Sequence, residues 1–294
     1  MCFEAAAPFY CTPTRVVANE RRGENPLQWV ERSAMYDIHC HILPDLDDGP
    51  KTMEDAVAMA RIAAADGTHT IIATPHGEQV AAKGGKDALQ ERVRSFSQAL
   101  LAESIDLKIA TGVEYLLSPE LLKETEEGRA VTLNGSRYIL VELDFHQWSP
   151  HTEDVFFQLQ LAGYIPVLAH PERQANIQQS PERLERLVER GVLSEVTAGS
   201  LLGEFGDRAQ GSAEELVRRG LVHFIASDGH SHLHNKRPPV MAEAKVALAE
   251  LAGEQTAELL AVANPLAVVN GKGIVFPEAV RFVRARRFPW FGRR

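Results

Sequence analysis

The chain has 294 residues, of which 45% are hydrophobic and 24% charged, so it can form one large α/β domain or two small ones. Its formal net charge of −9 argues against a general affinity for nucleic acid. No apolar run approaches the ~18 residues of a membrane span, and the first residues lack the pattern of a secretory signal. Three cysteines without paired spacing (Cys2, Cys11 and Cys40) fit a reducing compartment, so we expect a cytoplasmic protein.

Residues 1–33 show no sustained periodicity, and we expect them to form a poorly ordered extension before a domain that begins at residue 34. The first predicted strand ends in His39-Cys40-His41 and leads into a loop rich in carboxylates. Successive side chains of a strand point to opposite faces, so His39 and His41 share a face and Cys40 faces away. Two imidazoles about 7 Å apart at a strand end can hold one metal ion.

One pattern then repeats: a short apolar run ends in a polar residue, and a helix follows. Beyond the first strand, the runs predict strands at 70–76, 108–114, 138–142, 165–170, 192–196 and 222–228. Helices are expected at 54–66 (with Thr52 as N-cap), 86–103, from 119, and at 153–162, 181–190, 212–219, 240–251 and 255–262. This alternation predicts an α/β fold with parallel strands, and about seven units favour a closed or nearly closed barrel over an open doubly wound sheet.

Polar residues at the carboxyl ends of these strands are expected to converge at one mouth of the barrel. They are His39, His41, His76, Glu114, Glu142, His170, Asp228 and His230. Imidazole and carboxylate without thiolate suit manganese, iron or zinc. Several metal ions within bridging distance lower the pKa of a bound water and neutralise phosphoryl oxygens. The constellation therefore predicts a hydrolase, most simply one that acts on a phosphate ester.

Several motifs, in order along the chain, resemble those of the polymerase and histidinol phosphatase (PHP) superfamily. They are His39-Cys40-His41, Asp47-Asp48-Gly49, Thr74-Pro75-His76, Glu114, Glu142, His170-Pro171-Glu172-Arg173 and Ser227-Asp228-Gly229-His230. Within it, the chain is most similar to the manganese-dependent protein-tyrosine phosphatases of bacterial capsule and exopolysaccharide operons. The resemblance implies a distorted, TIM-like (β/α)7 barrel over residues 34–276. It also implies three metal ions, with Mn²⁺ the first expectation and Fe or Zn the alternatives.

Carried over residue by residue, the resemblance implies three metal sites. The first would use His39, His41, Glu114 and Asp228. The second would share Glu114 and add Glu142 and His170, and the third would use Asp48, His76 and His230. Arg173 and Arg237 would face the phosphate, because a guanidinium matches its geometry and stays charged. A hydroxide bridging the metals would attack phosphorus, and the implied substrate is a phosphotyrosine protein, such as a bacterial tyrosine kinase of polysaccharide export.

Other candidate residues are given structural interpretations. His69 and His223 lie early in their strands and receive no role, and four further histidines are expected in solvated loops: His146, His151, His232 and His234. Asp47 is expected to orient the loop or a ligand. Cys40 lacks the arginine six residues on that cysteine phosphatases need. The basic and aromatic tail, 277–294, could contact an acidic partner or a membrane surface, although a solvated terminus is favoured.

Two alternative functions stay open from the sequence. The same metal chemistry would serve a small-molecule phosphomonoesterase, such as a histidinol-phosphate phosphatase. A regulatory barrel that binds metal without turnover is the second alternative, and the complete set of ligands argues against it. The sequence does not distinguish between monomer and oligomer.

Overall fold

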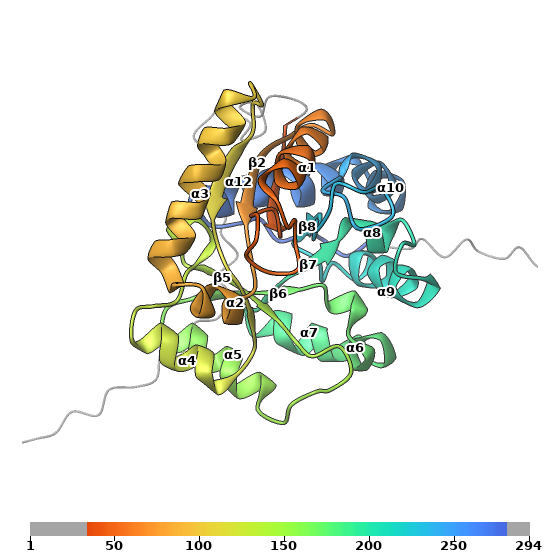
Figure 1. Ribbon diagram of the computed structural model, residues 1–294. Coiled ribbons are helices and arrows are strands. Elements are labelled where there is room, and N and C mark those ends of the chain that lie inside the picture. Colours follow the sequence, from red (N-terminus) through yellow and green to blue (C-terminus); the bar gives the residue numbers. More distant parts are fainter. Residues whose placement is uncertain (1–33, 281–294) are drawn as a thin grey trace, which may run out of the picture.

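The computed structural model describes residues 34–280 and consists of parallel strands surrounded by helices (Figure 1). The expected extension at 1–33 lies outside the described residues, as does all of the tail beyond residue 280. Within the described part of the chain, no helix combines the length and the hydropathy needed to cross a membrane.

The strands form two sheets, with the order β1-β2-β3 in the first and β4-β5-β6-β7-β8 in the second. Every pairing within them is parallel, which confirms the predicted α/β class. The strands are β1 (Met35–Cys40), β2 (Thr68–Ala73), β3 (Lys108–Thr111), β4 (Glu114–Leu116), β5 (Tyr138–Glu142), β6 (Ile165–Ala169), β7 (Leu193–Thr197) and β8 (Phe224–Ala226).

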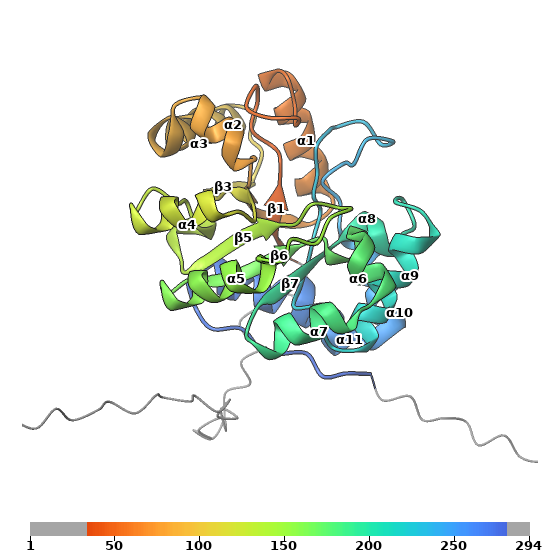
Figure 2. The same cartoon turned by 90° about the horizontal axis from the view of Figure 1, so that it is seen from below.

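The helices lie at the periphery, and Figure 2 shows them surrounding β1, β5, β6 and β7. Thr52 caps the first helix as predicted, because its side chain accepts a hydrogen bond from the Asp55 amide at 3.1 Å. The helices are α1 (Met53–Ala65), α2 (Gly77–Ala82), α3 (Gly85–Ala102), α4 (Pro119–Glu126), α5 (Thr152–Leu161), α6 (Ala175–Gln179), α7 (Glu182–Glu189), α8 (Ala198–Leu201), α9 (Asp207–Arg218), α10 (Ala242–Ala252), α11 (Glu254–Glu258) and α12 (Asn264–Val269). Three further helical segments are the 3-10 turns η2 (Leu133–Gly135) and η3 (Pro171–Arg173) and the π-helix η4 (Leu259–Ala263).

The predicted third strand, 108–114, is two strands rather than one. β3 pairs with β2 and β4 pairs with β5, so the chain changes sheets at Gly112-Val113. A Cβ atom at Gly112 would lie 2.7 Å from Ile72 Cγ2, so only glycine fits this crossing without displacing its neighbours. The seven β/α units therefore contain eight strands.

Backbone pairing between the two sheets is confined, within residues 34–280, to two places that we call the mouth seams. At the β1–β8 seam, Cys40 pairs with Gly229, and the Asp228 amide donates to the His39 carbonyl at 2.9 Å. At the β2–β4 seam, His76 pairs with Glu114. The β1–β8 seam lies at the carboxyl ends of its strands, whereas the β2–β4 seam joins the segment after β2 to Glu114, which is the first residue of β4 and not, as predicted, the last residue of a strand. The sheets therefore meet at the mouth where the predicted ligands lie.

Buried side chains form two clusters that support the mouth from below. In β5, Leu140 belongs to the smaller cluster, whereas Ile139 and Val141 belong to the larger one. Alternate side chains of a strand point to opposite faces, so the smaller cluster fills the space enclosed by the strands and the larger one packs under the helices. Ile38, Phe224 and their neighbours thus form a packed core rather than a pore.

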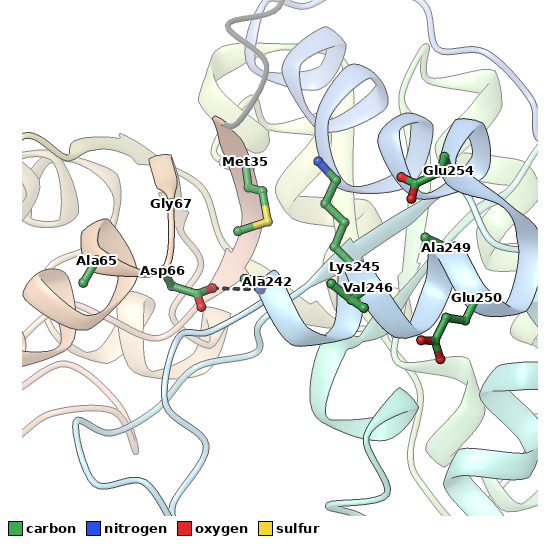
Figure 3. Close-up of a pocket in the computed structure, with 10 residues that line it drawn as sticks. All are labelled: Met35, Ala65, Asp66, Gly67, Ala242, Lys245, Val246, Ala249, Glu250 and Glu254. Carbon is green, nitrogen blue, oxygen red and sulfur yellow. Dashed lines mark hydrogen bonds between the residues drawn. The ribbon is translucent and has the colours of Figure 1, made fainter.

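The opposite end of β1 contains a cavity of about 610 Å³ between the end of α1 and α10 (Figure 3). Met35, the first residue of β1, contributes to its lining. The Asp66 carboxylate accepts hydrogen bonds from the Met241 and Ala242 amides, at 2.6 and 2.9 Å, and so caps α10. This contact joins the first helix to the later part of the chain, and none of the predicted metal ligands lines this cavity.

Candidate metal centre

The two histidines at the carboxyl end of β1, His39 within the strand and His41 just after it, are buried, and the Nδ1 atom of each contacts a carboxylate. His39 Nδ1 lies 3.0 Å from Glu195 Oε2, and His41 Nδ1 lies 2.6 Å from Asp47 Oδ2. A carboxylate accepts the proton of the nitrogen that faces it, so each Nε2 presents a lone pair. The two Nε2 atoms lie 3.3 Å apart. Two facing lone pairs are favourable only around a cation, so this donor set fits a metal ion.

Glu114 occupies the middle of the site and is 1% exposed. Its Oε1 lies 3.0 Å from His170 Nε2 and 3.3 Å from His39 Nε2. Its Oε2 lies 3.2 Å from both His41 Nε2 and His76 Nδ1. Burial raises the pKa of Glu114, but His39 in its protonated, metal-free form, together with hydrogen bonds from the protonated imidazoles, outweighs burial and leaves that pKa well below its usual value. The side chain is therefore an ionised carboxylate that can bridge two cations.

Four overlapping groups of side chains could each hold a metal ion, with the ligand atoms of a group within 4.8 Å of one another. All nine predicted ligands belong to at least one group, so the fold brings the whole predicted set together. The groups are His41-Asp48-His76-His230, His39-His41-Asp228, His39-Glu114-His170 and His76-Glu114-Glu142. The division of these ligands among three particular ions stays a prediction.

The site is buried on one side and open on the other. Asp228 is 2% exposed, whereas the side chain of Asp48 is 57% exposed. Burial and the neighbouring Glu114 raise the pKa of Glu142, while a hydrogen bond with His230 lowers the pKa of Asp48. A substrate can therefore approach from the side of Asp48, because the inner ligands are covered by protein.

Three of the predicted site residues adopt a backbone conformation that L-amino acids rarely take. The φ angles are +34° at His170, +49° at Asp228 and +54° at Arg237. Such angles cost free energy and persist where the surrounding structure imposes them. Here a backbone hydrogen bond of 2.8 Å from the His230 amide to the Arg237 carbonyl holds the loop after β8. Backbone strain thus concentrates where ligands must point into the mouth.

Both predicted phosphate-binding arginines contact the same carboxylate oxygen. Arg173 Nη1 lies 2.7 Å and Arg237 Nη1 3.1 Å from Asp228 Oδ2. Arg173 Cζ also lies over two aromatic rings, 4.7 Å from the centroid of Phe145 and 4.3 Å from that of Phe205. These contacts restrain the guanidinium while its edge stays available for further acceptors.

The turn that carries Arg173 is held by a buried carboxylate. Glu172 Oε1 accepts hydrogen bonds from Ser200 Oγ at 2.6 Å and from the Thr197 amide at 3.2 Å. Burial and the neighbouring Glu195 raise the pKa of Glu172 to about 7. These contacts tie η3 to the end of β7 and so set the position of the arginine.

Sequence reasoning missed Glu195, Phe145 and Phe205. One feature of the sequence could have indicated Glu195: it is a lone carboxylate inside the apolar run 192–196. The two phenylalanines lie in loops, where nothing in the sequence pairs them with Arg173.

The structural interpretations of the remaining residues agree with their contacts. Asp47 orients His41, as predicted, and also accepts a hydrogen bond from the Gly49 amide at 3.0 Å. Cys40 packs in the larger hydrophobic cluster, and burial raises the pKa of its thiol well above the usual value. His223 accepts a hydrogen bond from the Ser194 amide at 3.1 Å, away from the ligands. His69, His146, His151, His232 and His234 also lie outside the four ligand groups.

Comparison with known proteins adds a family match. Residues 35–270 match the family described as "Capsular polysaccharide synthesis, CpsB/CapC". The tyrosine-protein phosphatase YwqE of Bacillus subtilis is 41% identical over 197 residues, which are 67% of this chain and 78% of that protein. The tyrosine-protein phosphatase CpsB of Streptococcus pneumoniae is 29% identical over 240 residues, 80% of this chain and 98% of that one.

Solved structures show the same architecture. One solved structure superimposes with a TM-score of 0.79. It comes from a set described as crystal structures of YwqE from Bacillus subtilis and CpsB from Streptococcus pneumoniae, "unique metal-dependent tyrosine phosphatases". It is 36% identical and covers 84% of this chain and 100% of its own. A lactonase from Listeria monocytogenes, at 13% identity and a TM-score of 0.51, covers 83% of this chain and 96% of its own. The lactonase shares the fold alone.

Proposed function

This chain belongs to the capsular polysaccharide synthesis CpsB/CapC family, and on that premise we propose that it is a metal-dependent tyrosine-protein phosphatase. The observation that carries the proposal is the convergence of four metal-ligand groups with two arginines on one mouth. A phosphoryl group needs cations on its oxygens and a nearby activated water, and this donor set is suited to both.

Each residue of the site has a task in this proposal. His39, His41, Asp48, His76, Glu114, Glu142, His170, Asp228 and His230 would hold the metal ions. Bound metal would supply Lewis acidity and a water of lowered pKa. Glu195 and Asp47 keep the protons of His39 and His41 on the Nδ1 atoms. Arg173 and Arg237 bind and orient the phosphate, with Arg173 restrained by its two phenylalanines.

The finer identifications are part of the same proposal. We propose Mn²⁺ as the metal and three as the number of ions, because imidazole and carboxylate without thiolate suit manganese. We propose a bacterial tyrosine kinase of polysaccharide export as the substrate protein, supported by the capsule context of the family. A cytoplasmic location and a catalytic domain at 34–276 complete the proposal, and the family match at 35–270 supports these bounds.

The test compares three substrates on one preparation of the full chain loaded with Mn²⁺: a phosphotyrosine peptide, a phosphoserine peptide and histidinol phosphate. We expect hydrolysis of the phosphotyrosine peptide with the highest kcat/KM. Chelation should abolish it, and manganese should restore it better than magnesium, which prefers oxygen ligands. A higher kcat/KM for histidinol phosphate would favour the small-molecule phosphomonoesterase. Metal binding without turnover of any substrate would favour the regulatory barrel.

A further inference from the structure

A second cavity, of about 580 Å³, opens beside the metal centre, and we call it the lysine pocket. Its lining includes Lys51 from the loop before α1 and Lys236 from the loop after β8. The predicted ligands Asp48 and His230 also line it, so it is continuous with the site. Phe205, whose ring lies against the Arg173 guanidinium, forms part of its wall. A group in this pocket would therefore lie next to a phosphate held by the arginines.

The two lysines have no carboxylate partner among the described residues. Lys51 Nζ donates only to the Asp47 carbonyl, at 2.6 Å, and Lys236 is exposed without an ion pair. The pocket is lined by two carboxylates: Asp48 is a predicted metal ligand, and the Asp55 carboxylate lies 3.5 Å from His232 Nδ1. In a chain with a net charge of −9, two unpaired ammonium groups at one pocket are available for an anionic ligand.

Another cavity that borders the metal centre contains no lysine or arginine. It is smaller, at about 230 Å³, and is lined by His76 and by three carboxylates, Glu78, Glu114 and Glu142. Glu114 and Glu142 would hold metal, so exposed Glu78 is the carboxylate that stays free there, and a substrate that spans the mouth would meet the lysines near one cavity and Glu78 near the other. Electrostatic complementarity then selects both the composition and the direction of the bound peptide.

We propose that the lysine pocket binds an acidic side chain, aspartate or glutamate, that lies near the phosphotyrosine in the substrate protein. This inference rests on the proposed function and adds a sequence preference to it. Lys51 and Lys236 form charge-assisted contacts with the carboxylate, and Phe205 with Leu233 covers its apolar stem. The contact exists before and during the reaction, so it acts on KM rather than on kcat.

The experiment uses the full chain loaded with Mn²⁺ and three phosphotyrosine peptides of equal length, which carry glutamate, glutamine or lysine at the flanking positions. For the wild type we expect kcat/KM to be about threefold to tenfold higher with glutamate than with glutamine, as two partly exposed ion pairs would give. The difference should lie in KM and should shrink at high ionic strength. The lysine peptide should be the poorest of the three.

The variants separate a local contact from a general charge effect. In the double variant K51Q/K236Q the glutamate preference should fall to about one, and Lys236→Glu should favour the lysine peptide. The double variant K86Q/K272Q removes an equal charge from exposed positions outside the pocket and should keep the wild-type preference. Equal kcat/KM for all peptides in the wild type, or a preference that survives in K51Q/K236Q, would overturn the inference alone. A wild type that hydrolyses none of the peptides would instead overturn the proposed function.

Discussion

Glu195 shows how a single buried carboxylate sets the chemistry of a ligand that it only supports. Its Oε2 faces His39 Nδ1 at 3.0 Å and leaves His39 Nε2 free to bind metal. In Glu195→Gln an amide N–H can face Nδ1 instead, which favours the tautomer with its proton on Nε2. We therefore expect metal affinity to fall by about tenfold to a hundredfold, in line with losses at other supporting residues. Measurement of metal content after dialysis against graded chelator would test this.

The matched control for this change is Glu189→Gln, at an exposed position at the end of α7. It removes the same charge from the chain without touching a ligand, and should retain the metal affinity of the wild type. An unchanged affinity in Glu195→Gln would mean that the His39 tautomer does not depend on this carboxylate.

His223 gives the fold a defined sensitivity to acid. Burial lowers its pKa from 6.5 to about 4, so the folded protein holds it neutral where the unfolded chain would protonate it. The contribution of His223 to the free energy of unfolding is therefore complete above pH 6.5. It falls by about 1.4 kcal/mol per pH unit as the pH drops below 6.5, and it changes no further below about pH 4. In His223→Asn the side-chain oxygen can still accept the Ser194 amide, but the titrating group is gone.

Urea unfolding at pH 7.5 and pH 5 would test this expectation. Between these values the wild type should lose about 2 kcal/mol more unfolding free energy than His223→Asn. Equal losses in the two proteins would show that His223 titrates alike in the folded and unfolded chain.

At the scale of elements, the crossing at Gly112 determines how the first sheet passes to the second. A methyl group there would lie 2.7 Å from Ile72 Cγ2 and 3.0 Å from Leu133 Cδ2, both in the enclosed core. We expect Gly112→Ala to lower the free energy of unfolding by about 1–3 kcal/mol, as overpacking does in other cores. Urea denaturation with unchanged m-value is the measurement.

Gly211 provides the control because it lies in α9 with no atom within 4 Å of the position of an added Cβ. Gly211→Ala should raise the free energy of unfolding by about 0.5–1 kcal/mol through helix propensity. If both substitutions changed stability alike, the close approach at Gly112 would not be what limits that position.

The elements also show what the sequence can and cannot predict. The apolar runs predicted the order of strands and helices, because hydrophobic periodicity is a local property of the chain. The break at Gly112 and the short helices α2, α6, α8 and α12 were missed, since four to six residues carry too little periodicity. The ligand residues were predicted from their positions at strand ends. Glu195 was missed because its role depends on a contact across 156 positions of the chain.

At the scale of the whole molecule, every candidate metal group takes ligands from both sheets. His39, His41, Asp48 and His76 come with the first sheet, and Glu114, Glu142, His170, Asp228 and His230 with the second. Each of the four groups contains members of both sets. Metal bound there would hold the sheets together at the same ends where the mouth seams pair their backbones.

Chelation should therefore loosen the seams before it loosens either sheet. Hydrogen exchange at the amides of His41, Glu114 and Asp228, which bond across the seams, should speed up by on the order of a hundredfold when metal is removed. Amides inside β5 and β6 serve as the internal reference and should change less. A uniform acceleration at all of these amides would mean that metal stabilises the molecule as a whole rather than its seams.

The spread of the ligands along the chain also has a consequence for synthesis. The group with Glu142 is complete once residue 142 has left the ribosome, and the group with His170 follows. The two groups that need Asp228 and His230 are completed only when most of the chain has been made. The complete set of ligands therefore exists only after residue 230 has been made, so full metal loading requires that translation has passed this point.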